Sequence, residues 1–262
     1  MDRYKGVFLV AGLGMFFLAF VASGILPIAT LSDIPYQTLD EIAGDPIPEW
    51  RDLAERWPEA FEEAFGAEAR EQALLLSRNL EDQPADPAAV AATTRAYAEA
   101  LDRGRDIYIA EGCWHCHSQY VRGVSQEEER WGPVAMADEF ENELQLPQLW
   151  GTRRVGPDLS REWGRHTNDW HAAHLWDPKA TSPGSVMPAY PWLFEEDPVW
   201  QPEEAVRAAA AAIADEKERT TWLRRELART RLRPNRDGLS LITFLQWLGS
   251  WKPERPWNNA SL

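Results

Sequence analysis

The sequence predicts a mainly α-helical protein, with one transmembrane helix near the N-terminus and a helical domain after it. Two observations predict this class. An apolar run at residues 7–26 is long enough to cross a bilayer. Further along, apolar residues recur at three- and four-residue steps, which is the spacing of one face of an α-helix. We divide the chain into three parts, residues 1–32, 33–95 and 96–262.

The first part is predicted to be an uncleaved membrane anchor. Twenty residues at 1.5 Å per residue cover about 30 Å, the thickness of a hydrocarbon core. Arg3 and Lys5 precede the apolar run and acidic residues follow it, so the positive-inside rule places the N-terminus in the cytoplasm and the remaining chain outside. A cleaved signal peptide, with residues 21–23 as a loose cleavage site, is the alternative. The run is longer than the hydrophobic region of about 7–15 residues that is typical of such peptides.

The second part is predicted to be an acidic linker followed by a helical spacer. Residues 33–100 contain sixteen acidic residues against five arginines. We interpret this charge as a solvated face, with a docking role as the alternative. One apolar helix face is predicted from five aromatic and aliphatic residues at three- and four-residue steps: Trp50, Leu53, Trp57, Phe61 and Phe65.

The charge of the whole chain excludes one class of function. A formal net charge of −15 leaves no basic stripe to meet nucleic-acid phosphates. An acidic surface instead suits docking with a basic protein, such as a soluble electron carrier.

The third part contains the sequence Cys113-Trp114-His115-Cys116-His117. Cys-x-x-Cys-His is the attachment motif of a c-type haem. Two thiols on one helical turn can each add to a vinyl group of one porphyrin, and the following imidazole can ligate the iron. A zinc site would need further ligands at finger-like spacing, but the chain has only these two cysteines. A thioredoxin-type motif would follow a strand and would not need the histidine.

The motif therefore predicts one covalent haem c on Cys113 and Cys116, with His117 as an axial ligand. In bacteria this haem is attached outside the cytoplasm, which agrees with the predicted orientation of the anchor. We expect the protein in the inner membrane, with its haem domain in the periplasm.

The sixth iron ligand is predicted to be Met187, in the proline-rich segment 185–191. Class I cytochromes c have the same order, with the methionine on a proline-flanked loop between Cys-x-x-Cys-His and the last helix. Met136 lacks this context. His171 and His174 are further alternatives, which we interpret as packing residues. Ligation by histidine and methionine raises the reduction potential relative to ligation by two histidines, and it leaves no free coordination position on the iron. The site is therefore typical of an electron relay and not of a catalytic centre.

Residues near the predicted haem resemble the surroundings of the cofactor in class I cytochromes c. The turn that begins at Gly156-Pro157 is similar to their Gly-Pro-x-Leu turn, in which the proline carbonyl accepts a hydrogen bond from the proximal imidazole and orients it. An ordinary turn is the alternative. Arg153, Arg154 and Trp170 are predicted partners of the haem propionates, because an arginine fork matches a carboxylate. Solvated arginines are the alternative there.

Two further helices also resemble that fold. Gly104 and Tyr108 share a face of a helix at 88–110, and a final helix that Asn235 or Asp237 can cap carries one apolar stripe, Leu241, Phe244, Leu245 and Leu248. In class I cytochromes c such helices cross, with a small residue against aromatic or leucine side chains. The resemblance implies few strands, three to five helices and long loops around one haem. Residues 202–232, rich in Ala, Glu and Arg, are expected to be a helical insertion.

Several segments together resemble one family, the mono-haem subunit II of cbb3-type cytochrome c oxidases (the FixO or CcoO type). The segments are residues 104–113, 117–122, 150–159, 169–175 and 187–192. The resemblance is dense over residues 101–194. Two departures concern partner contacts and no haem ligand: residues 45–95 are a longer acidic spacer, and Val124 stands where the family more often has Pro-Phe.

The resemblance implies an electron-transfer subunit and not an enzyme on its own. Its partners would be the membrane-embedded catalytic subunit I and either a di-haem cytochrome c subunit or a soluble cytochrome c as donor. Subunit I would carry haem b, haem b3 and copper, and would reduce oxygen to water with proton pumping. The anchor would contact both subunit I and the lipid bilayer.

Three alternatives to this function remain open from the sequence. The mono-haem subunit of a nitric oxide reductase has the same ligands, but usually a shorter segment between motif and methionine than the 70 residues from His117 to Met187. A free membrane-anchored cytochrome c would be favoured by a glycine-rich tether, which residues 33–50 are not. A haem-based gas sensor or peroxidase-like enzyme would need an open sixth position.

Overall fold

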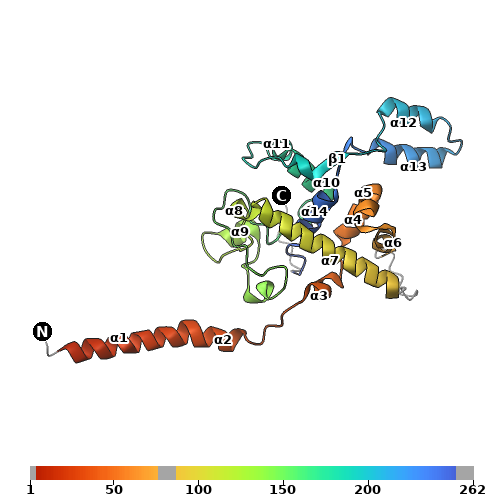
Figure 1. Cartoon of the computed structure of the whole chain (residues 1–262). Helices are drawn as coiled ribbons and strands as arrows, with labels where there is room; N and C mark the ends of the chain where they lie inside the picture. Colours follow the sequence, from red (N-terminus) through yellow and green to blue (C-terminus); the bar gives the residue numbers. More distant parts are fainter. Residues whose placement is uncertain (1–3, 76–86, 252–262) are drawn as a thin grey trace.

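The computed structural model describes residues 4–75 and 87–251, and in this part of the chain it is mainly helical (Figure 1). This confirms the predicted fold class. Residues 1–3, which include Arg3, and residues 76–86 of the predicted spacer lie outside the described residues.

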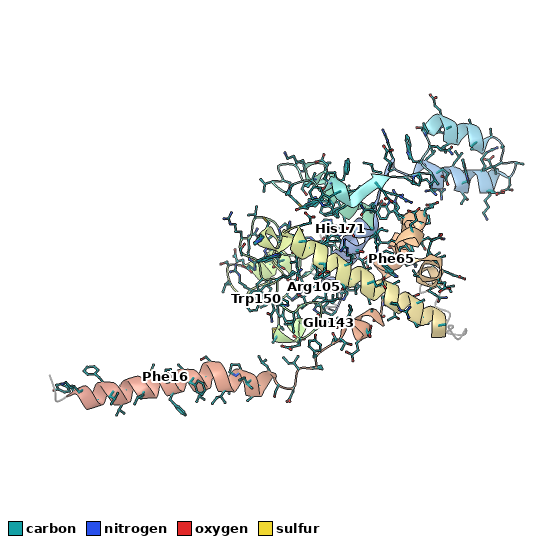
Figure 2. The ribbon with its side chains drawn as sticks, viewed as in Figure 1. Phe16, Phe65, Arg105, Glu143, Trp150 and His171 are labelled. Atoms are coloured by element: carbon teal, nitrogen blue, oxygen red, sulfur yellow. The ribbon has the colours of Figure 1, made fainter. Side chains whose placement is uncertain are left out.

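The N-terminal apolar segment forms one helical rod. It consists of α1 (Lys5–Phe20), a π-helical turn (Val21–Ile25) and α2 (Leu26–Leu31). The wide turn has a local cause, because Pro27 lacks the N–H for an i−4 hydrogen bond and its ring crowds the carbonyl of residue 23. None of the rod's side chains is buried, and Phe16 points away from it into open space (Figure 2). The rod, Lys5–Leu31, is long and apolar enough to cross a membrane, which supports a membrane anchor.

Four short helices follow, α3 (Leu39–Ala43), α4 (Pro48–Arg56), α5 (Pro58–Phe65) and α6 (Ala67–Leu75). Prolines occupy the first position of α4 and α5, where their missing N–H costs nothing. The predicted apolar face is turned inward. Trp50 is fully buried, with ring centroids 4.6 Å from Phe61 and 5.2 Å from Tyr97 of α7. The spacer therefore shares one hydrophobic core with the helices of the third part.

The centre of the molecule is the crossing of α7 (Pro87–Ala110) with α14 (Arg236–Trp247). A Cβ on Gly104 would lie 2.2 Å from the Ser240 carbonyl oxygen and 2.6 Å from Phe244 Cβ, so only glycine permits this approach. One turn later the Tyr108 ring packs 5.6 Å from that of Phe244. Asn235 caps α14 through the backbone N–H of Gly238. This is the crossing predicted from the sequence, and it fixes the end of α7 from which the haem motif leaves.

Loops with short helices cover one side of this crossing. The helical pieces are α8 (Cys113–Cys116), α9 (Glu127–Trp131), a 3-10 turn (Ala137–Phe140), α10 (Asn168–Trp176), α11 (Pro178–Thr181) and a second 3-10 turn (Pro191–Leu193). Strands β1 (Phe194–Glu196) and β2 (Leu232–Pro234) form a two-stranded antiparallel ribbon. Between them, α12 (Glu203–Ala210) and α13 (Glu216–Leu227) project from the body as a hairpin (Figure 1). The predicted insertion at 202–232 is therefore mostly helical.

Candidate haem site

The Cys-x-x-Cys-His motif forms a single helical turn at the end of α7. Gly112 joins α7 to α8 with φ of 68°, a left-handed conformation that favours glycine. The backbone N–H of His117 bonds to the carbonyl of Cys113 at 2.9 Å and closes the turn. Cys113 and Cys116 thus lie one turn apart, while His117 begins the following extended segment.

The imidazole of His117 is fixed by the turn at Gly156-Pro157. Its Nδ1 lies 3.0 Å from the Pro157 carbonyl oxygen. A carbonyl only accepts hydrogen bonds, so Nδ1 carries the proton and Nε2 keeps its lone pair. Burial lowers the pKa of His117, which keeps the ring neutral at pH 7. A Cβ on Gly156 would lie 2.3 Å from His117 Cε1, so the backbone touches the ring directly.

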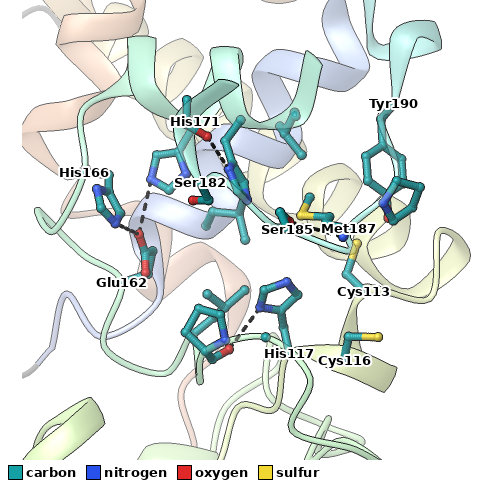
Figure 3. A pocket seen from close by; sticks show the side chains of 18 of the residues that line it. Cys113, Cys116, His117, Glu162, His166, His171, Ser182, Ser185, Met187 and Tyr190 are labelled. Atoms are coloured by element: carbon teal, nitrogen blue, oxygen red, sulfur yellow. Dashed lines mark hydrogen bonds and ion pairs between the residues drawn. The ribbon is translucent and has the colours of Figure 1, made fainter. Parts of the chain in front are cut away.

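The motif opens onto a cavity of about 860 Å³, within the range of about 300–1,000 Å³ that is usual for small-molecule sites. Figure 3 shows His117 on one side of this space and Met187 on the other, with Cys113 and Cys116 at its edge. Met187 is partly buried, and its backbone N–H bonds to Ser185 Oγ at 3.2 Å. The loop that carries Met187 is attached to α10 at Tyr190, whose backbone N–H donates to the carbonyl of Leu175.

The other predicted ligands have different positions. Met136 is 58% exposed and does not line the cavity. His171 and His174 do line it. His171 is buried, whereas Nδ1 of His174 lies 2.6 Å from Thr181 Oγ1.

Two observations argue against the other chemistries of a Cys-x-x-Cys pair. Burial raises the pKa of the Cys113 thiol to about 12, whereas a redox-active cysteine needs a lowered pKa. Within residues 4–75 and 87–251, no group of three or more His, Cys, Asp or Glu side chains is arranged to hold a metal ion. A zinc site built from these cysteines therefore has no support.

The predicted propionate partners are not together in the structure. Trp170 lines the cavity, stacked between His166 and His174 with centroids 3.6 and 4.5 Å away. Neither Arg153 nor Arg154 lines it. The propionate contacts of these two arginines stay a prediction.

The guanidinium of Arg154 has other partners. It lies 2.9 Å from Glu127 and 3.3 Å from Asp158, and it donates to the Tyr120 carbonyl. Asp158 also accepts from Ser118 Oγ and from the Tyr120 N–H. This buried network ties the segment after the haem motif to the turn that orients His117.

Sequence reasoning missed three residues of the cavity wall, Glu162, Arg165 and His166. They follow the Gly-Pro turn within six to ten positions, which is the only signal that could have drawn attention to them. A glutamate and an arginine there give no sign of burial, because both are normally exposed.

The residues present fit a haem. Two thiols, a neutral imidazole with a free lone pair and a thioether meet at one cavity of suitable size. The hydrogen bond from His117 Nδ1 to the Pro157 carbonyl fixes the tautomer that an iron ligand needs.

Comparison with known proteins agrees with this geometry. Residues 86–213 match the model of the family described as cytochrome C oxidase, mono-heme subunit/FixO. Comparison with curated protein sequences gave no match. The matched range includes the haem motif, the Gly156-Pro157 turn and Met187, and the family description implies a haem cofactor. Over residues 86–213 the chain is therefore similar to the FixO family of mono-haem cytochrome c oxidase subunits.

Proposed function

We propose that the protein is the membrane-anchored mono-haem cytochrome c subunit of a cbb3-type cytochrome c oxidase. It relays electrons from a cytochrome c donor to the subunit that carries haem b and the haem b3–copper centre, where oxygen is reduced to water. The observation that carries this proposal is the meeting of Cys113, Cys116, His117 and Met187 at one cavity, inside the range that matches the FixO family.

Each of these residues has a distinct role. Cys113 and Cys116 would hold the haem through thioether bonds, and His117 and Met187 would ligate its iron. Bound in this way, a haem c supplies reversible one-electron chemistry. The Met187 thioether favours the reduced state, and the Pro157 carbonyl holds the His117 ring in its ligating orientation.

The connection between anchor and haem domain favours a fixed relay over a mobile carrier. Gln37 is already bonded to the haem domain, since its N–H donates to the Glu141 carbonyl and its carbonyl accepts from the Glu143 N–H, both at 3.0 Å. The rod ends at Leu31, so six residue steps separate it from this contact. Six extended steps span at most about 20 Å. The haem domain therefore stays close to the membrane surface and to a membrane-embedded partner.

The proposed topology places the N-terminus in the cytoplasm and the haem domain in the periplasm. The donor is either a di-haem cytochrome c subunit or a soluble cytochrome c, and the anchor contacts subunit I. The match to FixO favours this reading over the mono-haem subunit of a nitric oxide reductase.

The test is to purify the full-length protein gently from membranes with its partners. Reduced-minus-oxidised spectra are then recorded with and without carbon monoxide. We expect haem c together with haem b, a carbon monoxide-sensitive b-type signal and oxygen uptake. Haem c without any co-purifying haem b would instead indicate a free anchored carrier. Carbon monoxide binding to the c-type haem itself would refute Met187 as a ligand.

A further inference from the structure

One wall of the cavity carries a buried acid that the ligand set does not use. Glu162 is 3% exposed and lines the cavity, and its Oε1 has no hydrogen-bond partner among the described residues. Two imidazoles face this oxygen, with His171 Nε2 at 3.7 Å and His166 Nε2 at 3.8 Å (Figure 3). His171 is also buried, and its Nε2 likewise has no partner among the described residues.

These contacts do not supply a counter-charge. Distances of 3.7 and 3.8 Å exceed hydrogen-bond range. Burial lowers the pKa of His171 to about 3 and that of His166 to about 4, so both rings are neutral at pH 7. His174, further along α10, also has its pKa lowered by burial.

Charged groups from the neighbouring elements are mostly engaged elsewhere. Among the described residues, Arg165 is the cation that acts on Glu162, and it lowers the pKa of that carboxyl. Arg161 on the same segment is paired with Glu139 at 2.6 Å. From α4, Glu49 accepts a hydrogen bond from Trp163 Nε1 at 3.0 Å.

From α14 only apolar side chains, Leu241 and Leu245, reach the cavity. Burial outweighs Arg165 and raises the pKa of Glu162 to about 7. The carboxyl therefore gains and loses its proton near physiological pH.

We propose that Glu162 is a proton-binding site coupled to the oxidation state of the haem site. Glu162 holds a proton when the site is reduced and releases it when the site is oxidised. On oxidation one electron leaves the iron for the b-type haem of the partner subunit, and the Oε–H bond of Glu162 breaks, with the proton passing to solvent. On reduction the electron returns to the iron and a proton returns to Glu162. The inference rests on the proposed function, since it needs a redox group in the cavity.

The size of the coupling follows from the dimensions of the cavity. Loss of one electron adds one positive charge to a cavity of about 860 Å³. Over about 10 Å, at an effective dielectric constant of about 20, that charge lowers the proton affinity of the carboxyl by about tenfold. A tenfold change in affinity corresponds to about 59 mV for a one-electron couple. We therefore expect the midpoint potential to fall by about that amount between pH 5 and pH 9, most steeply near pH 7.

The test is a redox titration of the c-type haem in the full-length protein within its oxidase complex, repeated from pH 5 to pH 9. Glu162→Gln keeps the shape of the side chain and removes the titration. The matched control is Asp169→Asn, a carboxyl on α10 that is paired with Arg56 and does not line the cavity. We expect the potential of Glu162→Gln to be nearly independent of pH, and the control to behave like wild type.

Three results would overturn the proposal. The first is a midpoint potential that does not depend on pH in wild type. The second is an undiminished pH dependence of the potential in Glu162→Gln, which would assign the proton to the propionates or the histidines. The third is a pH dependence that Asp169→Asn abolishes to the same extent as Glu162→Gln. If Glu162→Gln does not fold, proton release on oxidation of unbuffered wild-type complex at pH 7 decides the question: about half a proton per haem supports the proposal and none refutes it. A wild-type protein that contains no covalent haem c would refute the proposed function. A haem c whose midpoint potential does not depend on pH would refute only the proton coupling.

Discussion

Replacing Gly156 by alanine tests whether the backbone of the Gly-Pro turn holds the proximal imidazole. The new Cβ would lie 2.3 Å from His117 Cε1 and 2.7 Å from Nδ1. Carbon atoms pack at about 3.5 Å or more, so the ring must move by about 1.2 Å. Such a shift breaks the 3.0 Å bond from Nδ1 to the Pro157 carbonyl. It also moves Nε2 away from the position of an iron ligand.

The expected cost has two parts. Overpacking of a well-packed site costs about 1–3 kcal/mol, and the lost hydrogen bond adds about 1 kcal/mol. A total of about 3 kcal/mol lowers Tm by roughly 10 °C in a domain of this size. Because Gly156 does not have a positive φ, alanine fits its backbone, and the effect belongs to the contact with the ring.

The assay combines thermal unfolding with haem content and reduced-minus-oxidised spectra of the purified protein. Gly123→Ala is the matched control, since its Cβ would meet nothing closer than Val134 Cγ2 at 3.7 Å. We expect Gly156→Ala to lose stability and to show an altered spectrum, with the control unchanged. A Gly156→Ala protein with wild-type Tm, haem content and spectrum would refute this account of the proximal site.

Two further predictions concern the opposite side of the cavity. Met187→Ala is expected to let ferrous c-type haem bind carbon monoxide, which spectra will show, whereas Met136→Ala, outside the cavity, is expected to leave the haem closed. Stability is expected to rise between pH 4.5 and pH 6.5, measured by denaturant unfolding. In that window His166 and His171 bind protons mainly when unfolded, because burial lowers their pKa values in the folded state, and burial shifts His117 and His174 in the same direction. Glu162 binds its proton mainly when folded, but it is one group against several, so the unfolded state holds more protons. A flat or falling profile would contradict these burial effects.

The sequence was most informative where one local pattern determines one geometry. The four-residue spacing of Gly104 and Tyr108 predicted that they share one face of α7, and the resemblance to class I cytochromes c implied that this face meets the last helix. In the structure it does, because only glycine allows that approach. The Cys-x-x-Cys-His spacing likewise predicted a single turn with both thiols at one cavity.

Patterns that define a face without its partner were less informative. The spacing of Trp50 and Phe61 predicted an apolar stripe on a helix. The local sequence does not predict which part of the protein packs against that stripe. In the structure that part is Tyr97 of α7 and the core around it. The acidic residues on the outer faces of these helices then meet arginines far along the chain, as Glu59 meets Arg229 at 2.6 Å.

The same long-range packing explains why the acid on the cavity wall could not be predicted. Glu49 of α4 accepts a hydrogen bond from Trp163 at 3.0 Å through its carboxylate, and one from Asn168 at 2.9 Å through its backbone carbonyl. These bonds hold the segment from Glu162 to the start of α10 against the body of the protein. The burial of Glu162 therefore depends on helices more than a hundred residues earlier in the chain. It follows that the acidic spacer, which by composition is a solvated linker, also shapes the electrostatic environment of the haem site.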